Sequence, residues 1–423
     1  MNDSTDTPIV TVLSDRSALE PRLRDDAASV ASAATAAMRP DRLLLAFLAL
    51  MLLWAAGSVW DAVQEPQLSL AVNTGVDGVL GDLIRQLPDE RRSEAMDAIH
   101  RQRGSFEYLL ESAKIGATTS FYGLLELDAK AVFGGVTEGF VRPIRVLWSV
   151  DRGFLVVIGS WALLVLGVLG GAMCRSDVER LARDREVPLV AATRWAVKDW
   201  RRLWGVGMLP PVMVAVLLAP IAFVFGTVSL IPGLDVVVAL LWGVALVLGF
   251  AAAIVMTAWL VGLPLILPAA AIEAGDPVEV TVRVATLIRH RPFRALFLAG
   301  IAIITGLLAW MVIATIVVIT LSGAADALLV LDPIAPIARP AWPTLVLGID
   351  PASPEIEGAP VAWGATSRFS SQVIGWWNLL VVLVARAWIL GFALLAAGRI
   401  YLCLRRSVER LPFEDLGEPG PLG

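Results

Sequence analysis

The sequence predicts an all-α membrane protein with six transmembrane helices, interfacial cytoplasmic helical elbows and a small helical extracytoplasmic cap. Of its 423 residues, 57% are hydrophobic and only 17% are charged, and the mean hydropathy is +0.73, far from the composition of a soluble domain. The apolar residues also gather in runs of about 18 or more, the length that crosses a bilayer as a helix. Finally, Arg and Lys cluster in particular connecting segments, as the positive-inside rule expects.

The six predicted spans are separated by polar segments and one tight turn. They cover residues 43–60, 153–173, 206–230, 235–261, 295–321 and 373–404. Pro232 and Gly233 turn the third span directly into the fourth. Trp376, Trp377 and Tyr401 lie near the rims of the sixth, where amphipathic rings are favoured. The first run follows 42 polar residues and is too long for a signal peptide core, so we expect it to remain.

The distribution of Lys and Arg predicts the orientation of the chain. Basic residues crowd the segments 174–205 and 262–294 and follow the sixth span, whereas the turn between the third and fourth spans has none. This bias predicts that both segments and both termini face the cytoplasm. The loops 61–152 and 322–372 would then lie outside. The first of them also carries basic residues, but long loops translocate largely regardless of charge.

The tails and the two outer loops differ in composition. Residues 1–42 and 405–423 are expected to be cytosolic tails, the first of them disordered. The outer loop 61–152 contains amphipathic stretches, "DGVLGDLIRQL", "PDERRSEAMDAIHRQR" and "SFEYLLESAKIGATTSFYGLLEL", which predict a helical cap. The loop 322–372 is rich in proline and predicts an irregular segment. It is either a solvated connector or, through Trp342 and Trp363, a contact site.

The first basic segment predicts a helix lying in the membrane interface. Arg194, Lys198 and Arg201 recur at helical spacing, with alanine, leucine and tryptophan on the opposite side. Such a stripe binds anionic headgroups with about 1 kcal/mol for each basic residue. The alternative is that these charges only enforce the topology.

The second basic segment is ambiguous, because "VEVTVRV" alternates like a strand. We expect a helix, since an isolated strand would leave its backbone unpaired in the interface. Pro264 and Pro268 are expected to bend the fourth span into the interface. The basic side chains that would hold this elbow on the anionic leaflet are Arg283, Arg289 and Arg291. Glu273 and Asp276 are expected to cap the following helix, with a proton or cation site as the alternative.

The two elbows echo each other in sequence. Pro188 and Pro277 are each followed six residues later by an arginine, Arg194 and Arg283. The second and sixth spans also end alike, with "CRSDVERL" and "CLRRSVERL". These matches indicate a parallel repeat of a helical hairpin with a cytoplasmic elbow, or a coincidence, because few positions match.

A family resemblance rests on three of these segments. "RSDVERLARDREVPLVAATRWAVKDWRRL", "PAAAIEAGDPVEVTVRVATLIRHRPFRALF" and "RIYLCLRRSVERL" resemble the cytoplasmic elbows of uncharacterised bacterial multi-pass membrane proteins. These are similar in pattern to the membrane-domain part of glycerophosphodiester phosphodiesterase-like chains. The resemblance covers roughly residues 150–410. It implies an architecture only, because the catalytic barrel of those phosphodiesterases has no counterpart in this sequence.

Two arginines fall inside the sixth span. Arg386 follows Trp377 by nine residues, which puts it about 13 Å inside the rim of the span. A guanidinium there costs about 3 kcal/mol on insertion scales and usually faces the bundle interior. It predicts either a substrate or lipid-phosphate site or a structural hydrogen bond. Arg399 lies nearer the cytoplasmic end, and we expect it to snorkel to the interface.

No catalytic or cofactor motif is present in the sequence. His100 and His290 are predicted on opposite sides of the membrane, Cys174 and Cys403 at helix ends, and no cluster has metal-ligand spacing. We therefore expect no cofactor, no nucleic acid partner and no enzyme activity. The leading hypothesis is a membrane module that organises anionic lipids or partner proteins, with a protein partner or a second copy left open. The alternatives are a transporter with a site near Arg386, and a lipid-modifying enzyme that would need Glu94, Asp97 and His100 to cluster.

Overall fold

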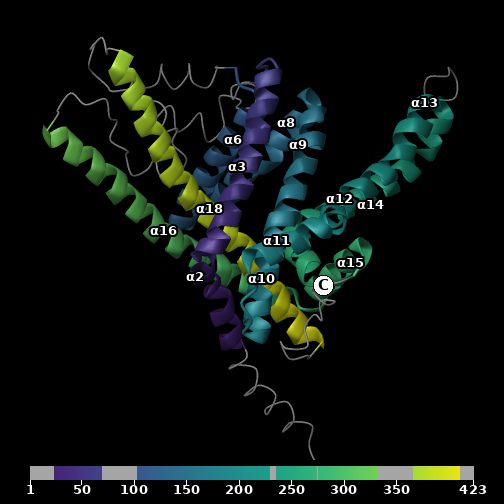
Figure 1. Ribbon diagram of the computed structural model, residues 1–423. Helices are drawn as coiled ribbons and strands as arrows, with labels where there is room; N and C mark the ends of the chain where they lie inside the picture. Colours follow the sequence, from purple (N-terminus) through teal and green to yellow (C-terminus); the bar gives the residue numbers. More distant parts are fainter. Residues whose placement is uncertain (1–22, 69–101, 229–234, 274, 332–364, 410–423) are drawn as a thin grey trace, which may run out of the picture. The chain divides into compact units, whose positions relative to one another are not determined.

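The computed structural model describes residues 23–68, 102–228, 235–273, 275–331 and 365–409 (Figure 1). It is 91% helical, and the described residues contain no named strand, only an isolated antiparallel bridge between Leu68 and Arg103. Six helices are long and apolar enough to cross a membrane, which confirms the predicted fold class. They cover Pro40–Val63, Arg152–Leu181, Trp200–Phe225, Leu240–Leu260, Pro292–Ala327 and Val373–Glu409.

The chain divides into two compact units. The first comprises Met1–Ala49, Leu163–Trp310 and Ala387–Gly423. Its elements are α2 (Ala33–Ala37), the start of α3 (Pro40–Val63), η3 (Leu166–Gly170), α10 (Gly171–Arg183), α11 (Leu189–Lys198), α12 (Trp200–Pro220), η4 (Ile221–Phe225), α13 (Gly226–Val228), α14 (Asp235–Ile272), α15 (Pro277–His290), the start of α16 (Pro292–Leu331) and the end of α18 (Ala365–Glu409). Within this unit α12 and α14 run side by side (Figure 1).

The second unit comprises Leu50–Ala162 and Met311–Arg386. Besides parts of α3, α16 and α18 it contains α6 (Ser105–Leu125), α7 (Ala129–Val136), η2 (Thr137–Val141), α8 (Arg142–Val150) and most of α9 (Arg152–Val165). The third amphipathic stretch of the outer loop is thus helical, as expected. The stretch "DGVLGDLIRQL" and nearly all of "PDERRSEAMDAIHRQR" lie outside the described residues.

Two aspartates tie the helix ends of the second unit together. Asp61 accepts hydrogen bonds from the backbone N–H groups of Phe106 and Glu107, both at 2.9 Å, at the start of α6. Asp151 accepts from the Ser105 hydroxyl at 2.6 Å, the Trp60 indole at 3.0 Å and the Phe154 N–H at 2.9 Å. Burial alone would raise the pKa of Asp151, but these three donors hold it below its usual value. The carboxylates thus anchor α6 and α9 beside the end of α3.

Three boundaries differ from the sequence prediction. Residues 23–31 are helical and α2 follows them, so the part of the predicted disordered tail that the structure describes is ordered. The helix expected to end at residue 261 extends further, because α14 continues through Pro264 and Pro268 to Ile272. An apolar surrounding offers no other partner for backbone groups, which favours continuing the helix. Residues 322–331 and 365–372 are also helical rather than irregular, and residues 332–364 lie outside the described chain.

Candidate functional site

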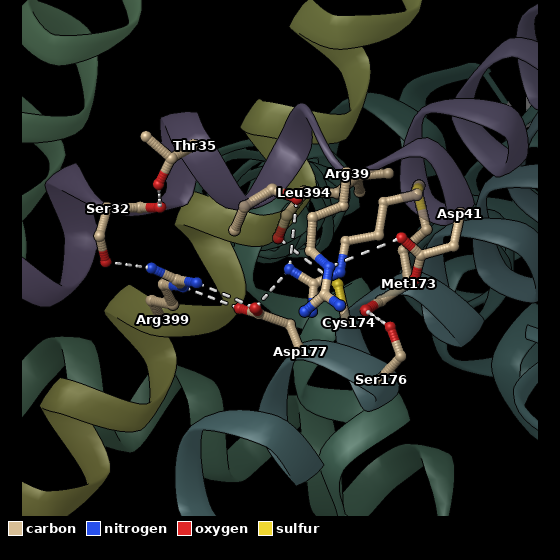
Figure 2. Close-up of polar contacts among 12 residues, drawn as sticks. Ser32, Thr35, Arg39, Asp41, Met173, Cys174, Ser176, Asp177, Leu394 and Arg399 are labelled. Carbon is tan, nitrogen blue, oxygen red and sulfur yellow. Dashed lines mark hydrogen bonds and ion pairs between the residues drawn. The ribbon is translucent and has the colours of Figure 1, made fainter. Parts of the chain in front are cut away.

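A buried ion cluster joins three helices of the first unit (Figure 2). The carboxylate of Asp177 on α10 binds Arg42 of α3 at 2.7 Å and two nitrogens of Arg399 on α18 at 2.7 and 2.9 Å. All three side chains are at most 6% exposed. Because one carboxylate balances two guanidinium groups, this cluster carries a net positive charge.

Further donors of the two arginines bind the N-terminal segment. Arg399 donates to the carbonyl of Ser29 at 2.7 Å and to the hydroxyl of Ser32 at 2.6 Å, as Figure 2 shows for Ser32. Arg42 donates to the carbonyl of Ala36 at 3.3 Å. Buried charges are tolerated only when they are paired and hydrogen-bonded, and here backbone carbonyls accept some of the hydrogen bonds that the two guanidinium groups donate. The helical residues 23–37, called the N-terminal helix below, are therefore a structural part of the cluster.

The expectation that Arg399 snorkels to the interface was wrong. Arg399 is only 5% exposed, because Asp177 provides a buried carboxylate for it. Sequence reasoning missed this pair, since the two residues are 222 positions apart. The one available signal was an aspartate, in "CRSDVERL", directly after an apolar span.

An open cleft of about 490 Å³ lies beside this cluster. Its lining comes from the N-terminal helix, α10 and α18: Ser32, Thr35, Ala36, Arg39, Asp177, Arg180, Leu181, Asp184 and Arg399. Arg180 is exposed, and it forms no hydrogen bond or ion pair with any residue in the described part of the chain. The cleft therefore combines a buried positive cluster at its wall with a surface guanidinium that acts on Glu186 through its charge but makes no hydrogen bond among the described residues.

A second salt bridge closes the edge of the cleft. Arg39 binds Glu186 at 2.7 Å, and its hydrogen bond holds the pKa of the Glu186 carboxyl below the usual value. Glu186 also raises the pKa of Arg39. The Glu186 side chain is 73% exposed, so solvent screens this pair and it contributes little to stability.

A second buried carboxylate, Glu273, lies just after α14. It accepts hydrogen bonds from Arg283 on α15 and Tyr401 on α18, and Arg405 lies 2.9 Å from it. The expectation that Glu273 and Asp276 cap α15 was wrong. Asp276 occupies the N-cap position without a side-chain cap bond. Glu273 instead joins α14, α15 and α18, because three donors converge on it.

The first elbow contains the amphipathic helix that the sequence predicts. In α11, Arg194 and Lys198 are exposed, whereas Ala192 and Ala196 on the other side are buried. Arg201 follows at the start of α12 and is also exposed. All three predicted basic side chains are therefore on the exposed surface of the elbow.

A stacked tryptophan holds α11 in that orientation. The guanidinium of Arg175 on α10 lies 4.0 Å from the ring centroid of Trp195, and that of Arg202 lies 5.8 Å from it. Arg175 is buried, which strengthens a cation–π contact. The tryptophan face of α11 is therefore fixed against the bundle and its basic face points away.

The second elbow is helical, as expected, but its basic residues are used differently. Arg289 and Arg291 are exposed. Arg283 is ion-paired with Glu273 and, at 3.1 Å, with Glu279. Partial burial by itself would lower the pKa of Arg283, but these carboxylates raise it. Arg283 is thus ion-paired within the protein although its side chain is 33% exposed, and its binding to lipid stays a prediction.

Arg386 lies in α18 and belongs to the second unit. It is partly buried and interacts with at least one other group. Arg386 does not line the cleft described above. Glu94, Asp97 and His100, which an enzyme hypothesis would require to cluster, lie outside the described residues.

Comparison with known protein families, curated proteins and solved structures finds no match. Among the described residues, no group of three or more His, Cys, Asp or Glu could hold a metal ion. The geometry therefore defines the candidate site by itself: a basic outer surface on α11 and a positive cleft between the N-terminal helix and α10.

Proposed function

We propose that this protein is a non-enzymatic membrane module that organises anionic lipid headgroups through its first elbow. The observation that carries the proposal is the division of α11 into two faces. Its alanines are buried and Trp195 is stacked on Arg175, while Arg194 and Lys198 are exposed. A helix of this kind, beside a span, suits the headgroup region of a bilayer.

Neighbouring side chains support this interfacial location. Trp200 is 41% exposed, and Arg201 lies against its ring at 5.7 Å. Tryptophan beside basic residues is typical of the membrane–water interface. We propose that this elbow lies on the cytoplasmic leaflet of a bacterial inner membrane, as the distribution of Lys and Arg favours. The architectural similarity to the membrane part of glycerophosphodiester phosphodiesterase-like chains belongs to the same proposal.

The double variant Arg194→Gln/Lys198→Gln tests this proposal. Each basic residue contributes about 1 kcal/mol to binding an anionic surface, so we expect about thirtyfold weaker retention of phosphatidylglycerol. Native mass spectrometry of the detergent-purified protein, titrated with phosphatidylglycerol, measures this. The control is Lys130→Gln/Arg145→Gln, which removes the same charge from exposed positions in the second unit. Equal loss of lipid in both double variants would contradict the proposal.

Transport is the second candidate function, and partial burial of Arg386 within a span favours it. A transporter needs a water-accessible path to such a residue. Substitution Arg386→Cys, followed by labelling with a membrane-impermeant thiol reagent in vesicles, tests for that path. Both native cysteines are buried, which keeps background labelling low. Absence of labelling from either side of the membrane would remove this candidate.

A further inference from the structure

We propose that the cleft between the N-terminal helix and α10 binds one phosphate group, carried by the headgroup of an anionic phospholipid or by a soluble phosphate ester. This inference goes beyond the role proposed for α11, because the cleft uses other residues. Its walls come from the N-terminal helix, α10 and α18. A volume of about 490 Å³ accommodates a phosphate together with a small attached group such as glycerol.

The charge of the cleft favours an anion. Three arginines and two aspartates line it. One of these aspartates, Asp177, is already bound by both Arg399 and Arg42, and Arg42 adds a further positive charge behind the wall. Asp177 therefore repels an incoming anion only weakly. The other acids here are Asp184 in the lining and Glu186 on Arg39, and the charges of Arg180 and Arg39 offset them. Positive charge partly shielded from solvent attracts an anion more strongly than the same charge in water.

Arg180 supplies the donors for such a group. It is exposed on α10 at the cleft, and within the described residues no hydrogen bond or ion pair engages it. A guanidinium offers five N–H donors in a planar fork that matches two phosphate oxygens. Arg180 can therefore bind a phosphate without breaking any contact among these residues.

The opposite wall contributes one further arginine and two hydroxyls. Arg39 is held by Glu186, whose side chain is 73% exposed, so a phosphate can replace this carboxylate at small cost. The hydroxyls of Ser32 and Thr35 each donate to a carbonyl three residues earlier, at 2.9 Å. Since hydroxyl groups rotate freely, either can donate to a phosphate oxygen instead. Arg180 and Arg39 thus line the same cleft from two different segments of the chain.

The experiment uses the full chain, purified in detergent, with phosphatidylglycerol as the lipid probe and diacylglycerol as the phosphate-free control. Native mass spectrometry measures the affinity for the first bound lipid. We expect Arg180→Gln to weaken phosphatidylglycerol binding about tenfold, as loss of a charge-assisted hydrogen bond does. Arg180→Lys should restore part of the affinity, because it keeps the charge and loses the fork. Diacylglycerol binding should not change in either variant.

Two further variants keep the result interpretable. Arg289→Gln removes an exposed arginine from α15, outside the cleft, and should bind like the unaltered protein. Thr35→Val preserves the side-chain shape and removes a hydroxyl from the opposite wall, so we expect a smaller loss than with Arg180→Gln. Neither change alters Arg194 or Lys198. Loss of the cleft site therefore leaves the lipid retention assigned to α11 intact, and the two proposals can fail separately.

A second measurement, with soluble phosphates in place of lipid, decides whether the bound phosphate belongs to a lipid headgroup or to a soluble compound. Glycerol 3-phosphate and inorganic phosphate are added, and the thermal unfolding midpoint is recorded in each variant. A rise in the unaltered protein that Arg180→Gln abolishes supports a soluble ligand. Lipid binding sensitive to Arg180, without that rise, supports a headgroup. The proposal is overturned if Arg180→Gln and Arg289→Gln have the same effect on phosphatidylglycerol and on both soluble phosphates.

Discussion

The two elbows have an arginine at a matching position, but the neighbours of that arginine differ between them. In α11 and α15 an arginine follows the leading proline by six residues, as Arg194 and as Arg283. Arg283 is paired with Glu273 and Glu279, whereas Arg194 is exposed and makes no ion pair within the described chain. Matching positions in the two elbows therefore serve different purposes, and the neighbouring acids decide which. One arginine joins helices and the other is exposed.

The largest effect is expected from removing the central acid of the second elbow. Glu273→Gln removes the buried carboxylate that Arg283 and Arg405 share, and leaves them only Glu279 and Glu409, one turn away on their own helices. Breaking a buried pair in this way costs about 3–5 kcal/mol. Thermal or denaturant unfolding in detergent micelles measures the loss. An unfolding midpoint like that of the unaltered protein would show that the cluster does not stabilise the elbow.

A smaller effect separates the two equivalent arginines directly. Arg283→Gln should lower the free energy of unfolding by about 1–3 kcal/mol, since a charged hydrogen-bond partner of a buried acid is lost. Arg194→Gln should change it by less than about 0.5 kcal/mol, as an exposed substitution does. The same unfolding assay compares them. Equal destabilisation by both would mean that the elbows are more alike than their contacts indicate.

The smallest effect is expected from a substitution that gives the first elbow an acid at the position where the second elbow has Glu279. Val190 is 66% exposed and precedes Arg194 by four residues, the spacing of Glu279 and Arg283. Val190→Glu should therefore form an i,i+4 pair and stabilise the helix by about 0.3–0.5 kcal/mol. It should also weaken retention of phosphatidylglycerol, because Arg194 becomes engaged. Val190→Gln controls for the loss of an apolar side chain, and equal lipid retention in the two variants would contradict this interpretation.

The parts of this fold that could be predicted from sequence depend on local pattern. Composition and run length predict the six long apolar helices, and helical spacing predicts the exposed side of α11. The ion clusters could not be predicted, because Arg42 and Asp177 are 135 positions apart and no local pattern pairs them. The helical N-terminal segment was missed for another reason. Its alanines, such as Ala33 and Ala37, are buried, yet alanine forms no strong apolar stripe although it favours helices.

The cluster at Asp177 has a consequence for biosynthesis. Arg42 and Asp177 are present once the second long helix has been made, but Arg399 emerges only with the final helix of the described chain. Until then, the carbonyl of Ser29 and one side of the Asp177 carboxylate lack their charged donor. A nascent or prematurely ended chain therefore exposes a polar defect in its core. Synthesis of α18 supplies these donors and removes that defect.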